Sequence, residues 1–179
     1  MQIERVQNIS PESLGKADFS FDVEEEAVPP FDGPALTNVA PVERYTKRYR
    51  VDPEIFDAQD DSRSMIAVAR EGGQVAGYIV ASRAWNNCAQ IDGFAVDRAY
   101  RRQGLGRQLM DEAVCWTREQ GLRVVRLETQ TNNIPACRFY GRYGFKLGGF
   151  DRHLYDEIPV HPRRETALFW YFSIGEIEK

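Results

Sequence analysis

The segment RRQGLGRQLM, residues 101–110, places arginines and a glycine pair directly before a helical pattern. It follows IDGFAV, residues 91–96, which has the apolar character of a strand. Glycine weakens a helix by about 1 kcal/mol relative to alanine, so Gly104 and Gly106 need another explanation. A strand, a glycine turn and a helix together present unpaired backbone N–H groups and the positive end of a helix dipole. The segment therefore predicts an anion site with room for a diphosphate.

This segment differs from the two common nucleotide-binding motifs. The Walker motif requires lysine and serine or threonine where Arg107 and Gln108 follow Gly106. The dinucleotide fingerprint requires a third glycine where Leu109 stands. Taken alone, the pattern also fits a tight turn with solvated basic residues, and this alternative stays open until a second motif is found.

The length and charge of the chain limit the classes of function. With 179 residues and 42% apolar residues, we expect a single domain over residues 1–179, divided into segments 1–62 and 63–179. Segment 1–62 has 14 acidic and 6 basic residues, whereas segment 63–179 has 13 and 17. This asymmetry fits either two differently solvated surfaces or an acidic part that attracts a cationic partner. A pI near 5.3 argues against nucleic acid as a partner.

The sequence gives no sign of a membrane, export or metal function. Its longest apolar run, residues 166–172, is far shorter than the roughly 20 residues of a membrane-spanning helix. The first ten residues lack the basic start and apolar core of a signal peptide, so we expect a cytoplasmic protein. Cys88, Cys115 and Cys137 lack metal-binding spacing, which predicts neither a disulfide framework nor a metal site.

Residue periodicity predicts an α+β fold with strand and helix order β-β-β-α-β-α-β-β from residue 65 onward. The strands are expected at residues 65–70, 75–82, 91–96, 123–130, 150–155 and 166–172, and the helices at residues 105–120 and 134–144. Gly72 and Gly73 predict a hairpin turn between the first two strands, and Gly144 predicts the cap of the second helix. The first third is harder to interpret. It suggests a strand at residues 3–6, a helix start at Ser10, an extended arm at residues 19–36 and a short helix capped by Asp52.

Two spaced motifs resemble those of the Gcn5-related N-acetyltransferase (GNAT) superfamily. The first is Arg101-x-x-Gly104-x-Gly106, and the second resembles N-x-x-A-x-x-x-Y-x-x-x-G-F through Asn133, Ala136, Tyr140, Gly144 and Phe145. The resemblance covers about residues 65–172. It implies a mixed, mostly antiparallel sheet of six to seven strands with helices on both faces. It also implies a splayed central parallel pair of strands that admits acetyl-CoA, and Gly93 fits a bulge or a splayed strand at this point.

The resemblance also implies which residues bind and react. Acetyl-CoA would contact Phe94, Ala95, Val96, Arg101, Arg102, Gln103, Gly104, Leu105, Gly106, Arg107, Asn133, Ala136 and Tyr140. Tyr140 would also protonate the departing thiolate, and Asp92 or Glu128 would take the proton of the acceptor amine. The two carboxylates stay as alternatives, because one of them could instead only attract the cation. Transfer is expected to be direct in a ternary complex, although an acyl-enzyme on Cys137 is conceivable.

Within the superfamily, the segments LETQTNN, PAC, LGG and ETA resemble those of the streptothricin acetyltransferases. This resemblance implies an acetyl-CoA-dependent N-acetyltransferase that modifies a primary amine of a small cationic acceptor, with streptothricin as the first candidate. Two alternatives are a protein N-terminal or lysine acetyltransferase and a non-catalytic acyl-CoA-binding module. A homodimer is left open.

Overall fold

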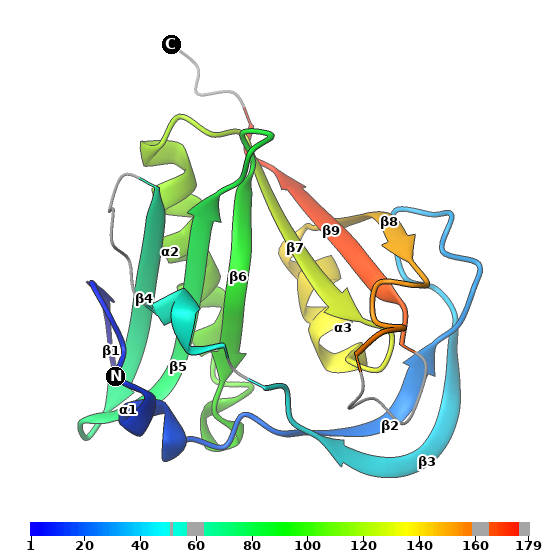
Figure 1. Cartoon of the computed structure of the whole chain (residues 1–179), viewed down its shortest axis with the longest axis horizontal. Coiled ribbons are helices and arrows are strands. Elements are labelled where there is room, and N and C mark those ends of the chain that lie inside the picture. The colour runs from blue at the N-terminus through cyan, green and yellow to red at the C-terminus, as the bar shows by residue number, and fades with distance from the viewer. Residues whose placement is uncertain (51, 57–62, 159–164, 176–179) are drawn as a thin grey trace. The chain divides into compact units, whose positions relative to one another are not determined.

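The computed structural model describes all residues except 51, 57–62, 159–164 and 176–179 (Figure 1). The chain divides into two compact units. The first unit contains residues 1–21, 48–125 and 174–179, and the second contains residues 22–47 and 126–173. His161 and the acidic run at residues 57–61 lie outside the described residues.

The first unit is built on four antiparallel strands in the order β1-β4-β5-β6. These strands are β1 (Gln2–Val6), β4 (Ser64–Glu71), β5 (Gln74–Arg83) and β6 (Ala89–Val96). Gly72 and Gly73 join β4 to β5 with positive φ angles of 57° and 80°, which glycine adopts readily. The hairpin predicted at these glycines is therefore confirmed.

Helices cover both faces of these strands. On one face, Ile66, Val68, Tyr78 and Val80 pack with side chains from α1 (Pro11–Gly15) and from the 3-10 turn η1 (Pro53–Phe56). On the other face lies α2 (Leu105–Glu119), which contacts β4, β5 and β6. The apolar positions of α2 are buried as their spacing predicts, because residues three and four apart share one face of a helix.

The second unit contains three strands in the order β7-β9-β8 and a separate two-stranded ribbon (Figure 1). Its elements are β2 (Phe21–Ala27), β3 (Val39–Lys47), β7 (Val124–Gln130), α3 (Ile134–Tyr143), β8 (Lys146–Asp151) and β9 (Ala167–Ser173). Helix α3 ends at Gly144 with a φ of 117°, which confirms the predicted glycine cap. Within the described residues, no helix is long and apolar enough to cross a membrane.

The fold class is confirmed as α+β with a mixed, mostly antiparallel sheet. The strand predicted at residues 150–155 was wrong, because β8 covers Lys146–Asp151. Its two glycines argue against a strand by propensity, yet a Cβ at Gly148 would lie 2.4 Å from the ring of Tyr171. Glycine therefore permits a close approach of ring and backbone within the strand pair.

Strand β3 was missed altogether, and its burial pattern explains why. Intermediate and exposed positions alternate along β3, and no residue of the strand is fully buried. A half-exposed ribbon strand with Pro41 near its start lacks the apolar alternation by which strands are recognised.

The packing of α2 on β5 yields a stability prediction at Gly77. A Cβ there would lie 2.9 Å from the carbonyl oxygen of Ala95 and 3.1 Å from Leu109 Cδ1. We expect Gly77→Ala to lower the free energy of unfolding by about 1–3 kcal/mol, because backbone must move to accommodate the methyl group. Thermal unfolding measures the effect. The control is Gly15→Ala, which meets nothing within 4 Å and should be neutral or slightly stabilising; equal Tm values for the two variants would contradict this packing.

Candidate functional site

The predicted anion site is an open turn at the start of α2. Gly104 is the N-cap, with a φ of 83° and no side-chain capping bond. The first backbone bonds of the helix run from the N–H groups of Arg107 and Gln108 to the Gly104 carbonyl, at 3.0 and 3.2 Å. The amides of Leu105 and Gly106 come before these two bonds in the helix. The first amides of any helix have no acceptor within it. A Cβ at Gly104 would meet nothing within 4 Å, so the space over these amides is open.

The basic residues of this turn have different surroundings. Arg101 is partly buried, and its Nε donates to the Val96 carbonyl at 2.9 Å, which ties the turn to the end of β6. Gln103 Nε2 donates to the carbonyl of Ala99 at 3.0 Å. Arg102 and Arg107 are exposed, and Arg102 has a positive φ of 62°. The turn therefore presents two exposed guanidinium groups beside the helix start, as binding of a diphosphate requires.

Strand β6 contains the expected irregularity. Its register with β5 shifts between Val80–Gly93 and Ala81–Ile91, which leaves Asp92 as the extra residue of a bulge. Beyond the bulge, Phe94, Ala95 and Val96 pair regularly with β5.

Gly93 also has a packing role that the sequence did not reveal. A Cβ there would lie 2.6 Å from Ile55 Cδ1 and 3.2 Å from the ring of Tyr78. Glycine at this position therefore serves the packing of η1 on β6 as well as the bulge.

Asp92 has the electrostatic character of a proton acceptor. Its side chain keeps an exposed surface, yet the surrounding protein displaces enough water to raise the pKa of its carboxyl above the ordinary value. A hydrogen bond with Ser82 opposes this increase. A carboxylate with a raised pKa holds a proton more strongly, which suits a general base.

In the second unit, α3 begins at Asn133, whose Oδ1 accepts a hydrogen bond from the Ala136 amide at 3.2 Å. Tyr140 of the same helix is buried, with ring contacts to Phe145 and Trp170. Burial raises the pKa of its phenol well above the usual range, so the group stays protonated at neutral pH. A protonated phenol meets the requirement for a general acid.

Cys137 lies on α3 as well. Burial raises the pKa of its thiol to about 12, which leaves almost no thiolate at neutral pH. This environment fits a packing role and disfavours an acyl-enzyme on Cys137.

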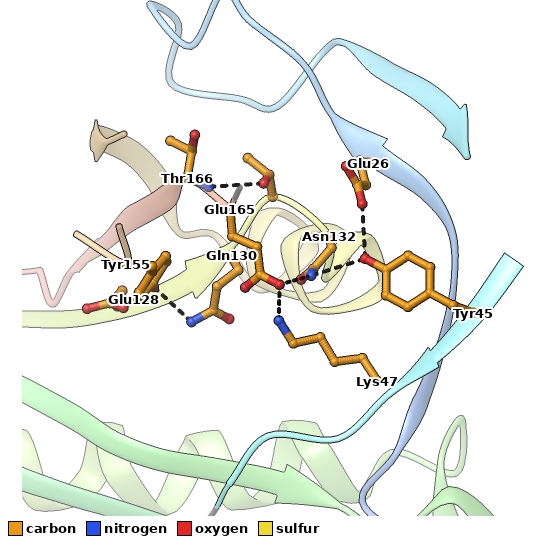
Figure 2. Close-up of polar contacts among 10 residues, drawn as sticks. Glu26, Tyr45, Lys47, Glu128, Gln130, Asn132, Tyr155, Glu165 and Thr166 are labelled. Atoms are coloured by element: carbon orange, nitrogen blue, oxygen red, sulfur yellow. Dashed lines mark hydrogen bonds and ion pairs between the residues drawn. The ribbon is translucent and has the colours of Figure 1, made fainter. Parts of the chain in front are cut away.

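Glu128 belongs to a polar cluster of the second unit, shown in Figure 2. The polar cluster consists of Glu26, Tyr45, Lys47, Glu128, Gln130, Asn132, Tyr155 and Glu165. Glu128 and Gln130 are two residues apart on β7, so their side chains leave the strand on the same face. The Tyr155 hydroxyl donates to Glu128 Oε1 and accepts from Gln130 Nε2 at 2.8 Å.

The buried part of the polar cluster centres on Glu165. Its Oε1 contacts Lys47 Nζ and accepts from Asn132 Nδ2 at 2.7 Å. The side chains of Lys47 and Glu165 are only 10% and 7% exposed. Tyr45 continues the network, because its hydroxyl accepts from Asn132 at 3.3 Å and donates to Glu26 at 3.0 Å. The cluster thus holds three carboxylates and one ammonium group, so it carries an excess of negative charge.

Of these residues, only Glu128 was predicted from the sequence. Tyr45 and Lys47 come from β3, and Glu165 precedes β9, so the cluster joins segments more than 100 residues apart. The signals were present but ambiguous. Glu128, Gln130 and Asn132 alternate within LETQTNN, as residues on one face of a strand do.

A pocket of about 620 Å³ also lies within the second unit. It is lined by Pro34, Ala35, Leu36, Thr37, Val39, Ile134, Cys137, Arg138, Gly141, Arg142, Gly144, Phe145, Lys146 and Trp170. Apart from Cys137, whose environment disfavours an acyl-enzyme, none of the predicted catalytic or acetyl-CoA-binding residues lines this pocket, so we do not place the transfer chemistry there.

Comparisons with known proteins agree with the motifs. The model of the acetyltransferase (GNAT) family matches residues 24–145. A streptothricin acetyltransferase of Escherichia coli is 36% identical over 132 residues, which cover 74% of this chain and 75% of that protein. Streptothricin acetyltransferase A of Bacillus subtilis is 29% identical over 181 residues, covering 96% of this chain and 99% of that protein.

A solved structure extends the likeness to the fold. A Bacillus anthracis protein, named for streptothricin acetylation and crystallised with acetyl coenzyme A, matches with a TM-score of 0.80 and 29% identity. The match covers 97% of this chain and all of that one. The chain therefore belongs to the GNAT family and is an acetyl-CoA-dependent N-acetyltransferase.

Proposed function

We propose that the acceptor is a primary amine of a small cationic molecule, with streptothricin as the first candidate. The observation that carries this proposal is the polar cluster, whose three carboxylates exceed its single ammonium group. Excess negative charge attracts a cationic acceptor and excludes anionic ones. The names of the E. coli and B. subtilis relatives support streptothricin over other amines.

The proposed reaction needs a base and an acid. A lysine-like ammonium has a pKa of about 10.4 and must lose a proton before its nitrogen can attack. Asp92 or Glu128 takes this proton, directly or through water. The nitrogen then bonds to the thioester carbonyl carbon, the carbon–sulfur bond breaks, and Tyr140 gives its proton to the thiolate. The second proton of the nitrogen leaves as the amide forms and restores the phenol, directly or through water. The raised pKa of Asp92 and the protonated state of Tyr140 support these roles.

For acetyl-CoA, we propose the residues that the motifs indicate. The turn at residues 101–107 holds the diphosphate, and the backbone of Phe94, Ala95 and Val96 holds the pantetheine arm. Asn133 and Ala136 of α3 also contact acetyl-CoA. We further propose that the chain is one GNAT domain in which segment 1–62 serves the acceptor. Glu26, Tyr45 and Lys47 support this last point, because all three belong to the polar cluster.

A panel of amines tests the acceptor. Release of free thiol from acetyl-CoA is measured with streptothricin, with other small polyamines and with peptides that carry a free N-terminus or lysine. We expect turnover with streptothricin, because its cationic amine-bearing arm matches the charge of the polar cluster. Turnover with peptides alone would identify a protein acetyltransferase. Acetyl-CoA binding without turnover of any amine would identify a non-catalytic module, and either result would overturn the proposal.

Two glycines at opposite ends of α2 form a matched pair for testing the diphosphate site. Gly104 and Gly121 both have positive φ angles, of 83° and 67°, and a Cβ at either would meet nothing within 4 Å. Alanine at either position should cost about 1 kcal/mol of stability through backbone strain. Only Gly104→Ala places a methyl group over the first amides of the helix, so it alone should raise the Kd of acetyl-CoA, by about 10-fold. Calorimetry measures the Kd, and equal Kd values for the two variants would refute the site.

Tyr140 is tested by removing its hydroxyl while keeping its ring. We expect Tyr140→Phe to lower kcat about 100-fold, because general acid catalysis contributes at least this much. The Kd of acetyl-CoA should change less than about 3-fold, since the packed ring remains in place. Tyr143→Phe, in the same aromatic cluster, is the control and should leave kcat unchanged. Equal losses of kcat and affinity in Tyr140→Phe would assign its hydroxyl to binding instead.

A further inference from the structure

Tyr155 connects two side chains of β7 through its hydroxyl (Figure 2). A phenol has one proton to donate, an amide N–H can only donate, and a carboxylate can only accept. The hydrogen bonds therefore run in one direction, from Gln130 to Tyr155 and from Tyr155 to Glu128 Oε1. Donation to a carboxylate is charge-assisted, which makes it stronger than a bond between neutral groups.

This arrangement constrains a side chain that is otherwise exposed. Glu128 lies on the exposed face of β7, where a free glutamate would sample several rotamers. Oε1 of Glu128 is engaged by Tyr155, and in the described part of the chain Oε2 has no hydrogen bond. The bond to Tyr155 thus selects one orientation of the carboxylate and leaves Oε2 available for a second donor.

We propose that Tyr155 is a positioning residue for Glu128, which it holds so that Oε2 contacts the acceptor ammonium. This inference rests on the proposed function, in which Glu128 contacts the amine either as its base or as its counter-ion. A fixed carboxylate raises the rate because the amine is held in one geometry instead of many.

The segment that carries Tyr155 is itself held in place. After β8, Asp151 Oδ1 accepts from the His153 amide at 2.8 Å, and His153 Nδ1 lies 2.7 Å from a carboxylate oxygen of Asp156. The amide of Ile158 donates to the Tyr155 carbonyl at 3.1 Å. These local bonds form a turn that fixes the backbone from which the phenol extends.

The charges around Tyr155 keep its phenol protonated. Burial raises its pKa first, followed by the hydrogen bond and negative charge of Glu128 and by the charge of Glu165. The hydrogen bond from Gln130 lowers the pKa of Tyr155. The charge of Glu165 is paired with that of Lys47. The pKa of Tyr155 therefore lies far above its ordinary value, so Tyr155 acts as a donor to Glu128 and not as a phenolate base.

The test compares Tyr155→Phe, Glu128→Gln and the double variant with the control Tyr171→Phe. Tyr171 belongs to the same unit, and its hydroxyl makes no hydrogen bond recorded among the described residues. Initial rates with acetyl-CoA and streptothricin are measured against pH, and thermal unfolding is measured for each variant. If streptothricin is not turned over, the best amine of the panel takes its place.

We expect Tyr155→Phe to lower kcat/KM for the acceptor about 10-fold, with the KM of acetyl-CoA unchanged. In the Glu128→Gln background, Tyr155→Phe should have little further effect, because Tyr155 acts through Glu128. Unfolding temperatures of the two single variants should likewise be non-additive in the double variant, a readout that needs no acceptor.

Three results would overturn the inference, and they differ from failure of the proposed function. Additive effects in the double variant would show that Tyr155 acts independently of Glu128. A wild-type kcat/KM for the acceptor in Tyr155→Phe would show that its hydroxyl does not orient the carboxylate. Equal losses in Tyr155→Phe and Tyr171→Phe would indicate a general structural effect. Full activity of Glu128→Gln would instead refute the role of Glu128 on which the proposed function depends.

Discussion

The contact between the Lys47 ammonium and the Glu165 carboxylate organises the second unit. Both side chains are almost fully buried, and a buried charge is costly unless a partner compensates it. Asn132 donates to the same carboxylate oxygen, so the segment after β7, the end of β3 and the start of β9 meet at one atom. Tyr45 and Glu26 extend the contact to β2. Loss of either charge would leave the other buried and unpaired.

The same constraint explains the composition of the polar cluster. Lys47 compensates Glu165, whereas the carboxylates of Glu26 and Glu128 are bonded to the phenols of Tyr45 and Tyr155. A phenol satisfies a carboxylate without neutralising it, so two negative charges remain for an external cation. A lysine or arginine in place of both tyrosines would have made the cluster neutral. The choice of tyrosine thus links the stability of the cluster to its proposed preference for a cationic acceptor.

The sequence predicted the first unit well, because its signals are local. Gly72 and Gly73 marked a hairpin, the apolar spacing from Leu105 marked α2, and Gly104 marked the turn before it. Gly93 was correctly placed at a bulge, but its contact with Ile55 comes from a distant segment and gave no signal.

The second unit depends on contacts between distant segments, and there the sequence was less informative. Strand β8 was misplaced because Gly148 and Gly149 weaken a strand by propensity, whereas the ring of Tyr171 requires glycine at residue 148. Lys47 and Glu165 each look like solvated surface residues in the sequence. Only the pairing of β2 with β3 and the path of the chain before β9 bring these two side chains together.

Asp92 and Glu128 were equivalent candidates in the sequence, and their environments now separate them. Asp92 projects from a bulge where reduced solvation raises the pKa of its carboxyl, which strengthens it as a proton acceptor. Glu128 instead accepts a hydrogen bond from a phenol, which fixes the orientation of its carboxylate. A carboxylate held in one orientation suits the binding of an ammonium group, whereas one that takes up a proton more readily suits its deprotonation.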